Sequence, residues 1–597
     1  MYVGVNLPEK AGASVPSVLE AGFDFATARI TTSAYRRKVQ AILERGAVPA
    51  PENDDLALFP DDLVGQKVGL AAPWAELDAK DPLLAEMSLE VLKNEIEYAQ
   101  FCGLSFVVIP GPRRRAHTTL FAHSIAQLLA AAPRITLLIH TSFCEEFSPT
   151  KSPPVDLLST WSVWESIATL CGFSPRLQLA LEVPVHVLPQ LLVSRWACEP
   201  VAMLVLASKS VFVPNPKNYP VLHKHSQLLL TTFLHAGTPF VLLRDVEPDE
   251  DAHLIYLRHL HSKIPVPPRA IAAITNILQL PLEPQSTNLD NETYQLFESD
   301  SFKYNQYYAA MLAALDTTTL TKSPTTVVVA GAGRGALVDK LLLAGKKLGI
   351  SLAVHAIEKN PGAVAYLRAR NAREWAHAAV TIHAADARTW TPPPGPLDLV
   401  VSEMLGSFGD NELAPEALSP LSRVCSLFVP QRHSSHVAPA FSPLLYQKAL
   451  DAGPHRPYIV HCTKVQLLAE PQPVWDFEYP LGDNLDRTSR ITFSQIHSAT
   501  LHGFIGYFSA DLYAGIQLCT LPDSSDAPTS WFPMWFPLET PACLSPGHEI
   551  DLTIWRRTSG PSMSYQWCAE IYRREGSRRF RTWGSQIHNR DLATRWH

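Results

Sequence analysis

Residues 325–344 read TTVVVAGAGRGALVDKLLLA, and they decide the fold of the middle of this 597-residue chain. The β-branched run predicts a buried parallel strand, the glycines a tight turn, and the residues that follow a helix. Gly331 permits the turn, Gly333 lets the backbone approach a ligand, and the helix start offers free N–H groups. Gly331, Gly333 and Ala336 also fit the loose dinucleotide fingerprint, so a nicotinamide or flavin cofactor stays an alternative, as does a glycine turn without a ligand.

Two further predicted strands follow this turn, and each ends in an acid. The run SLAVHAIE ends in Glu358, which is placed to accept hydrogen bonds from both hydroxyls of a ribose. The run VTIHAAD ends in Asp386, whose carboxylate can accept from an adenine amino group. Together with the glycines, these acids favour an adenosine ligand without saying which one.

The fourth strand of this region, in LDLVVSEMLGSFGDNEL from Leu397, ends at Glu403, and a short loop leads to Glu412. Two carboxylates on one loop repel each other unless a cation lies between them. The guanidinium of arginine is the natural cation, because its planar fork pairs with carboxylates and stays protonated. A divalent metal and two solvated loop acids are the alternatives, and apart from Asp410 no metal-ligating cluster supports the first.

The N-terminal part of the chain alternates strand-like runs with helical patterns. Residues 84, 87, 91 and 98 predict one apolar helix face that ends before Gly103. Eight strands in such a series match a (β/α)8 barrel, and an open parallel sheet is the competing interpretation. The eight runs begin at Val3, Phe23, Val68, Ser105, Ile135, Leu177, Ala202 and Pro239.

These patterns predict an α/β plus β protein with three domains. Residues 1–265 form a TIM-like barrel, and the Pro-rich residues 266–290 form a linker. Residues 291–430 form a Rossmann-like domain. After Pro430 alternating runs separated by Gly, Pro, Asp and Ser predict an antiparallel barrel-like or sandwich-like segment over residues 431–597.

The composition is that of an ordinary globular protein, with 46% hydrophobic and 18% charged residues. A net charge of −7 argues against a nucleic-acid binder. Nine dispersed cysteines without a CxxC pair indicate reduced thiols. We see no signal peptide and no apolar run of membrane-spanning length, so we expect a soluble intracellular protein without a membrane partner.

The loop Ser402-Glu403-Met404-Leu405-Gly406-Ser407, continued by Asn411-Glu412, resembles the double-glutamate loop of the protein arginine methyltransferases. The wording GSFGDNELAPE is most similar to the type II branch, which makes symmetric dimethylarginine. The resemblance covers essentially the whole chain. It implies S-adenosylmethionine as cofactor, Glu403 and Glu412 as the catalytic grip on arginine, and the same order of barrel, Rossmann-like domain and C-terminal β-barrel.

Further matches to the family assign more site residues. By resemblance, Tyr294 and Lys303 contact the methionine end of the cofactor, and Tyr304 lies near adenosine. Phe297 resembles the type II marker, and Thr529-Ser530-Trp531 resembles the loop whose tryptophan packs on the substrate arginine. Ala387 is smaller than the methionine usual in type II enzymes, which puts its contact with the ligand in doubt. The expected cofactor-binding set is Tyr294, Lys303, Tyr304, Gly331, Gly333, Gly335, Glu358, Asp386 and Ala387; the expected substrate-binding set is Phe297, Ser530 and Trp531.

The resemblance implies methylation of Gly/Arg-rich proteins, Sm-type proteins and histone tails, to monomethyl and symmetric dimethyl products, in cytoplasm and nucleus. It also implies a homo-oligomer and a WD-repeat propeller partner on the N-terminal barrel. A non-catalytic adenosine-binding scaffold and an NAD-dependent oxidoreductase are the alternatives; neither explains paired glutamates.

Several other polar groups are expected to have no catalytic role. His140, Glu182 and Asp245 fall at barrel strand ends, where such enzymes act, but we expect a docking barrel there. Residues 113–115, three arginines, predict a solvated loop, and His433 with His436 predicts a polar turn without a metal.

Overall fold

The computed structural model describes residues 1–7, 15–42, 48–60, 67–145, 156–237, 239–246, 251–265, 269–317, 324–494, 496–522, 524, 528–591 and 594–596. The chain divides into two compact units, Met1–Arg269 and Ala270–His597, and each is considered by itself. No helix of the described residues has the length and apolar character needed to cross a membrane.

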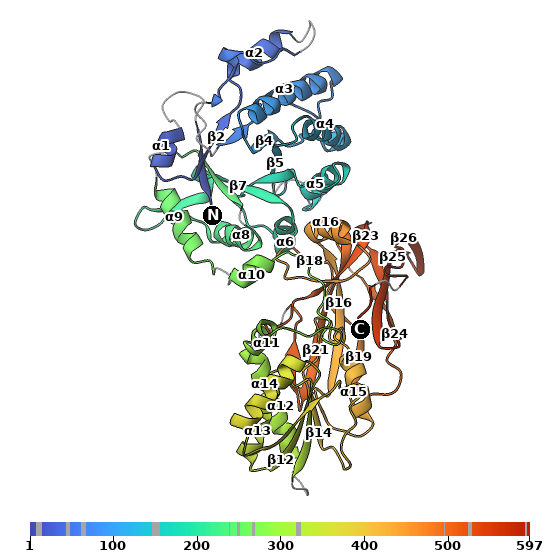
Figure 1. Cartoon of the computed structure of the whole chain (residues 1–597). Coiled ribbons are helices and arrows are strands. Elements are labelled where there is room, and N and C mark those ends of the chain that lie inside the picture. Colours follow the sequence, from blue (N-terminus) through green and yellow to red (C-terminus); the bar gives the residue numbers. More distant parts are fainter. Residues whose placement is uncertain are drawn as a thin grey trace. The chain divides into compact units, whose positions relative to one another are not determined.

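The first unit is a closed barrel of eight parallel strands (Figure 1). All eight predicted runs form its strands, in the ring order β1-β10-β7-β6-β5-β4-β3-β2, so the barrel prediction is confirmed and the open sheet is excluded. Apolar side chains such as Phe25, Leu138 and Leu242 fill the interior. The strands are β1 (Val3–Asn6), β2 (Phe25–Arg29), β3 (Lys67–Leu70), β4 (Phe106–Pro110), β5 (Thr136–Ser142), β6 (Leu177–Glu182), β7 (Val201–Ala207) and β10 (Phe240–Arg244).

Helices alternate with these strands, and one of them buries a different face from the predicted one. In helix α3, Val91 is buried as expected, but Leu84 and Met87 are only half-buried. The buried face instead includes Ser88 and Glu95, and a pattern based on apolar residues overlooks these. The helices are α1 (Val15–Glu20), α2 (Ser33–Ile42), α3 (Pro82–Phe101), α4 (Thr118–Ala131), α5 (Ser159–Leu170), α6 (Gln190–Cys198), α7 (Ser208–Val211), α8 (Lys224–Ala236) and α9 (Ala252–Ser262); β8 (Phe212–Pro214) and β9 (Pro220–Leu222) form a hairpin.

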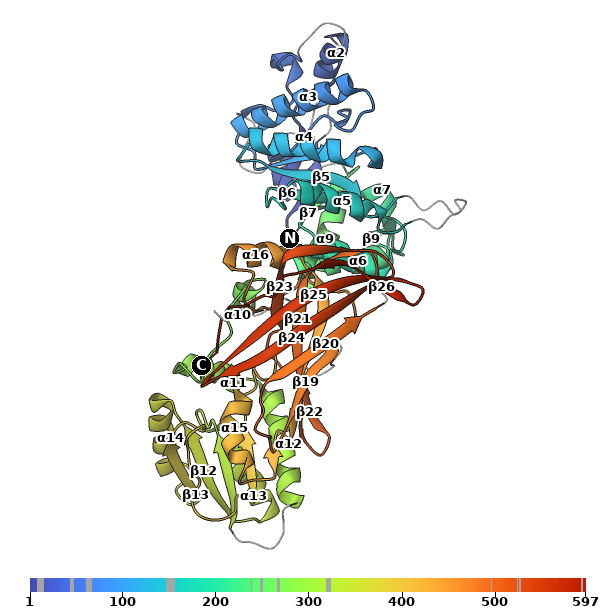
Figure 2. The same cartoon turned by 90° about the vertical axis from the view of Figure 1, so that its right-hand side faces the viewer.

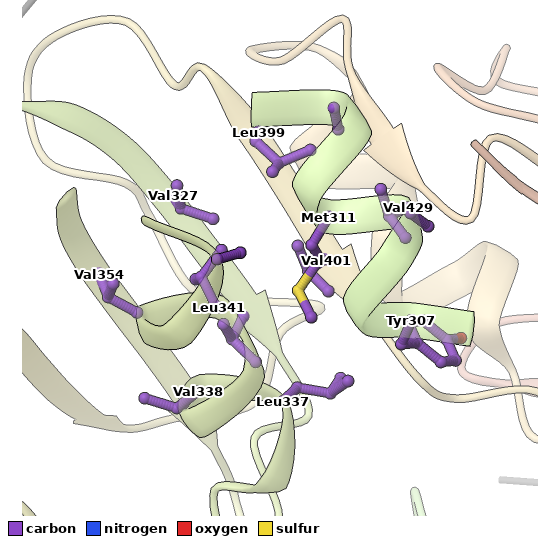
Figure 3. Packing of buried hydrophobic residues seen from close by; sticks show 14 of the residues in the cluster. Tyr307, Met311, Val327, Leu337, Val338, Leu341, Val354, Leu399, Val401 and Val429 are labelled. Carbon is purple, nitrogen blue, oxygen red and sulfur yellow. The ribbon is translucent and has the colours of Figure 1, made fainter. Parts of the chain in front are cut away.

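The second unit begins with a parallel five-stranded sheet in the order β13-β12-β11-β14-β15. Figure 3 shows Tyr307 and Met311 of α12 and Leu341 of α13 directed at Val327 and Val401 of this sheet. This packing fixes the strand ends that carry the expected site. The elements are α11 (Asn291–Glu298), α12 (Ser301–Thr317), β11 (Thr325–Ala330), α13 (Ala336–Leu348), β12 (Leu352–Glu358), α14 (Pro361–Arg373), β13 (Ala379–Ala384), β14 (Leu399–Ser402), α15 (Ala414–Ser422) and β15 (Phe428–Val429).

The C-terminal part is antiparallel, as predicted, and its strands form a seven-stranded and a four-stranded sheet. The larger sheet is built around β16, β21 and β23, and the smaller one has the order β20-β24-β25-β26 (Figure 2). The elements are β16 (Arg432–Phe441), α16 (Pro443–Ala452), β17 (Tyr458–Ile459), β18 (Gln466–Leu467), β19 (Gln472–Glu478), β20 (Arg487–Phe493), β21 (Ala499–Tyr513), β22 (Ile516–Cys519), β23 (Met534–Leu544), β24 (His548–Ser559), β25 (Ser562–Glu575) and β26 (Arg578–Gly584).

The predicted linker, residues 266–290, is partly regular. Residues 266–268 lie outside the described residues, and helix α10 (Arg269–Ile274) follows them. Gln279 then exchanges backbone hydrogen bonds of 2.9 and 2.8 Å with Ile459 of β17. The segment that precedes the Rossmann-like domain is therefore hydrogen-bonded to the C-terminal sheet at Gln279.

Candidate functional site

The glycine turn after β11 has the backbone that its sequence requires. Gly331 and Gly333 both have positive φ, 72° and 53°, a region that favours glycine. Tyr294 lies against Gly333, where an added Cβ would be 3.2 Å from the tyrosine ring. The Gly333 N–H donates to Glu358 Oε2 at 2.8 Å, so turn and acid form one surface.

Gly335 packs against neighbouring side chains instead of facing the cofactor cavity, as was predicted for it. It precedes α13 with φ 96°, and a Cβ there would lie 2.6 Å from Trp375. It does not line the cavity described below. The glycine is needed for close packing of the turn against Trp375 and Leu367 of the α14 region.

The two acids at the strand ends, Glu358 and Asp386, differ in whether their carboxylates reach the cavity described below. Glu358 accepts from the backbone N–H groups of Gly333 and Asn360 at 2.8 and 2.7 Å, and it lines the cavity. Asp386 does not line the cavity, because the guanidinium of Arg388 covers its carboxylate with contacts of 2.8 to 3.1 Å. Burial raises the pKa of Asp386, but Arg388 more than offsets this and lowers it overall.

Helices α11 and α12 bring a cation to the glutamates. Lys303 Nζ lies 3.4 Å from Glu403 Oε2, and its side chain is 1% exposed. The ammonium also lies over three aromatic rings, 5.3 Å from the centroid of Phe297, 5.1 Å from Tyr304 and 4.8 Å from Trp531. This cluster of rings and carboxylate is a cation-binding environment.

Glu403 directly follows β14, and a tight hairpin leads from it to Glu412. Gly406 and Gly409 close the hairpin with backbone hydrogen bonds of 3.1 and 2.8 Å. Asn411 Oδ1 accepts the N–H of Phe408 at 2.8 Å and stiffens the turn. The loop therefore presents the two glutamates from a fixed backbone.

Glu403 and Glu412 repel each other, and Lys303 balances only part of their charge. Burial and the neighbouring Glu403 raise the pKa of Glu412 to about 8, and Lys303 counteracts them only in part. A second cation between the carboxylates would remove this repulsion. The site can therefore accept a positively charged ligand group.

The C-terminal domain closes the site with residues 529–531. Trp531 Nε1 donates to the carbonyl oxygen of Leu405 at 2.7 Å, which fixes the indole beside the glutamate loop. Asp300 accepts from the N–H of Thr529 at 2.8 Å and from both N–H and hydroxyl of Ser530 at 3.0 and 2.8 Å. Burial raises the pKa of Asp300, but hydrogen bonds from the Lys303 N–H and from the hydroxyl and N–H of Ser530 lower it overall.

One cavity of about 380 Å³ brings the predicted residues together, a size suited to a small ligand. All predicted site residues line it except Gly335 and Asp386. Ala387 is among the lining residues, so it reaches the cavity despite its size. The prediction missed several lining residues. Arg334 and Met404 adjoin predicted residues and Asn360 follows Glu358 by two positions, whereas Gln285 and Leu289 lie in the predicted linker.

The other polar groups are only partly as expected. His433 and His436 lie in strand β16, not in a polar turn, and His433 is fully buried. Arg113 and Arg114 are not simply solvated, because both pair with Glu76 at 2.6 and 2.8 Å. No three His, Cys, Asp or Glu side chains of the described residues are grouped to hold a metal ion.

At the barrel strand ends, the three groups with an expected non-catalytic role are placed differently. Glu182 pairs with Arg244 and lies 3.4 Å from His140 Nε2. Asp245 takes a left-handed backbone conformation, with φ 62°, just after β10. Glu182 is therefore already paired with a cation, Arg244.

Comparison with known proteins gives matches along nearly the whole chain. Residues 22–263 match the PRMT5 TIM barrel domain, 269–429 the PRMT5 arginine-N-methyltransferase and 432–595 the PRMT5 oligomerisation domain. The chain is 34% identical to protein arginine N-methyltransferase skb1 of Schizosaccharomyces pombe over 96% of this chain and 95% of that protein. It is 31% identical to protein arginine N-methyltransferase 5 of Oryza sativa subsp. japonica, covering 95% and 94%. The Xenopus laevis protein of that name is 29% identical over 92% of each.

The glycine turn, the acid at the end of β12 and the paired glutamates thus occur together in a chain that matches one family from its barrel to its last strands. The chain belongs to the PRMT5 family of arginine N-methyltransferases, which use S-adenosylmethionine as methyl donor.

Proposed function

We propose that the chain methylates arginine in Gly/Arg-rich protein segments, including Sm-type proteins and histone tails, and forms monomethyl and then symmetric dimethylarginine. The observation that carries the proposal is that Glu403 and Glu412 line one cavity with an aromatic wall made of Phe297, Tyr304 and Trp531. Guanidinium fits such a site, because it pairs with carboxylates through its edge and stacks on rings through its face.

The cavity fits S-adenosylmethionine by the chemistry of its lining. Glu358, held by two backbone N–H groups, presents an acceptor for ribose hydroxyls next to the glycine turn. Lys303 supplies a positive charge for the carboxylate of the cofactor, and Tyr294 covers the turn. When bound, the cofactor supplies an electrophilic methyl group on a sulfonium.

The residues of the chain then hold and activate the arginine. A guanidinium nitrogen is a poor nucleophile because its lone pair is delocalised. Glu403 and Glu412 draw the positive charge toward themselves and orient the reacting nitrogen, which combines electrostatic stabilisation with positioning. Once it has lost its own proton to pair with the guanidinium, Glu412 can accept the proton that the nitrogen loses.

The symmetric product is supported by resemblance at two positions. Phe297 faces the Lys303 ammonium on the aromatic wall, at the position of the type II marker. Ser530 replaces the histidine found in asymmetric relatives, and its hydroxyl is engaged with Asp300. We propose that these two residues allow monomethylated arginine to bind in only one orientation. In that orientation the unmethylated terminal nitrogen faces the methyl donor, so the second methyl group gives the symmetric product.

The remaining proposals concern assembly and location. The match of residues 432–595 to an oligomerisation domain supports assembly of several copies. We further propose a WD-repeat propeller as partner of the N-terminal barrel, and activity in cytoplasm and nucleus. Size-exclusion chromatography with light scattering tests the assembly.

The deciding experiment incubates the purified full chain with methyl-labelled S-adenosylmethionine and an Arg-Gly-rich peptide, followed by separation of the methylarginine isomers. We expect monomethyl and symmetric dimethylarginine from the wild type and some asymmetric product from Phe297→Met. Absence of transfer, even with added partner proteins, would refute the activity. A purely asymmetric wild-type product would refute only the roles given to Phe297 and Ser530.

A further inference from the structure

A buried arginine of the C-terminal domain lies beneath the loop that carries the paired glutamates. Arg556, in strand β24, is fully buried, and all three of its nitrogens donate hydrogen bonds. Nε donates to Asp410, Nη1 donates to the carbonyl oxygen of Leu485 at 3.0 Å, and Nη2 donates to both oxygens of Glu416 at 2.7 and 2.8 Å. Neither Arg556 nor its two acidic partners lines the cavity.

The two acids held by Arg556 lie on either side of Glu412 in the sequence. Asp410 precedes it in the hairpin, and Glu416 follows it in the first turn of α15. Asp410 is itself fully buried and also accepts from the Ser435 hydroxyl at 3.1 Å and the Trp475 indole at 3.3 Å. One guanidinium therefore ties down the backbone before and after Glu412.

The backbone at this place needs such restraint. Leu413, the residue after Glu412, has φ 64°, a left-handed conformation that is unfavourable for leucine. Such a conformation persists only where the surroundings enforce it. The contact of Arg556 Nη2 with both oxygens of Glu416 fixes the helix start on one side of Leu413, and the Nε contact with Asp410 fixes the hairpin on the other.

We propose that Arg556 is a positioning residue for methyl transfer: through Asp410 and Glu416 it sets the direction in which Glu412 meets the substrate guanidinium. The proposal rests on the proposed function of the glutamate pair. Arg556 lies in a strand of the C-terminal domain, 146 residues after Asp410 in the sequence. The C-terminal domain would therefore hold the loop that carries Glu412 without contacting the substrate itself.

The competing explanation is that the three charged groups serve only stability. Breaking a buried ion group is strongly destabilising, because it leaves charges without partners. A purely structural role would weaken thermal stability, cofactor binding and turnover together. A positioning role would affect the peptide steps while the cofactor still binds, since Glu358 and the glycine turn do not depend on Arg556.

The test compares Arg556→Lys with Arg557→Gln in the full-length chain. Arg557 is the adjacent residue on the same strand, its side chain is 41% exposed, and it lies 3.7 Å from Asp486. Lysine keeps the charge but lacks the fork that joins Asp410 to Glu416. We expect Arg556→Lys to lower kcat/KM for an Arg-Gly-rich peptide by about 100-fold, the effect of misplacing a reacting group by roughly 1 Å.

Two further readouts separate the explanations. Cofactor affinity, measured calorimetrically with S-adenosylmethionine, should stay within about twofold of wild type. The pH dependence of the peptide KM should shift, because Glu412 changes its surroundings. Asp410→Asn, which is nearly isosteric, should give the same pattern more mildly and serves if Arg556→Lys folds poorly.

Folded Arg556→Lys or Asp410→Asn protein with the kcat/KM and pH dependence of Arg557→Gln would overturn the proposal. So would a loss of activity that merely parallels loss of cofactor binding. A wild-type chain that transfers no methyl group would contradict the proposed function instead, so the two failures can be told apart.

Discussion

Acidic side chains follow parallel strands in both units of the chain, but their charge environments are opposite. In the barrel, His140 and Arg244 together hold the pKa of Glu182 below its usual range, and His140 has the larger effect. In the second unit, burial and Glu403 raise the pKa of Glu412 to about 8. The barrel acid is already paired with Arg244, whereas the two glutamates share one cation, Lys303, and lack a second. This difference, rather than position at a strand end, separates a structural acid from one that awaits a ligand.

The strongest way to break this comparison is to neutralise one acid in each unit. Glu403→Gln should lower kcat by about 1,000-fold, because a group that stabilises developing charge is lost. Cofactor affinity should stay within about twofold, since Glu403 is proposed to face arginine. Steady-state kinetics with a labelled cofactor and calorimetry measure the two effects.

The matched control for this change is Glu182→Gln in the barrel, which should leave kcat and KM within about twofold of wild type. Loss of cofactor binding in Glu403→Gln would show that its role is misplaced. Equal losses in both variants would remove the distinction between the two acids.

The pH dependence of peptide binding sharpens the comparison. With a pKa of about 8, Glu412 is protonated in the free enzyme below that pH and must lose its proton to pair with a guanidinium. The peptide KM should therefore fall by about tenfold between pH 7 and pH 9 and then level off. Peptide binding at pH 7 should release a proton, which calorimetry in buffers of different ionisation enthalpy detects.

The slope should disappear in Glu412→Gln and persist in Glu182→Gln. A peptide KM that stays constant from pH 7 to pH 9 in the wild type would mean that Glu412 is already ionised at pH 7. The repulsion between Glu403 and Glu412 would then be too weak to raise the pKa of Glu412.

The smallest expected effect concerns the stability of the barrel. A carboxylate whose folded pKa is depressed stabilises the fold above its unfolded pKa and loses that contribution as the pH falls through the folded value. Glu182 and its partners are each about one-third exposed, so we expect Glu182→Gln to cost no more than about 1 kcal/mol at pH 7. Urea unfolding of the barrel at pH 7 and at pH 3 measures this, and the difference from wild type should shrink at the lower pH. A cost that is independent of pH would point to packing instead of charge.

Local sequence patterns were sufficient for the barrel strands and for the glycines and acids of the site, whereas its aromatic residues, Lys303 and Ser530 were assigned by resemblance to the family. The runs from Val3 to Pro239 each became a barrel strand because β-branched residues and regular spacing are local signals. Glu358 and Glu403 line one cavity because they lie at the carboxyl ends of β12 and β14, the parallel strands on either side of β11, and Glu412 follows Glu403 on a hairpin.

What the sequence missed depends on contacts between distant residues. Nothing near Arg388 indicates that its side chain covers Asp386, and Gly335 could not be assigned to packing without knowing where Trp375 lies. The buried face of α3 was misjudged because Glu95 is polar, yet it is held inside by the Ala72 N–H at 2.7 Å. Arg556 meets Asp410 from another domain, which no spacing rule reveals.

The hydrogen bonds from residues 529–531 to Asp300 and to the Leu405 carbonyl have a consequence for whether the two domains can be separated. A chain that ended at Val429 would contain the whole parallel sheet and both glutamates, yet it would lack Ser530 and Trp531, which line the same cavity. Recombination that exchanged the C-terminal strands for those of another protein would have to preserve these contacts to preserve the site. Neither domain therefore forms the complete cavity by itself.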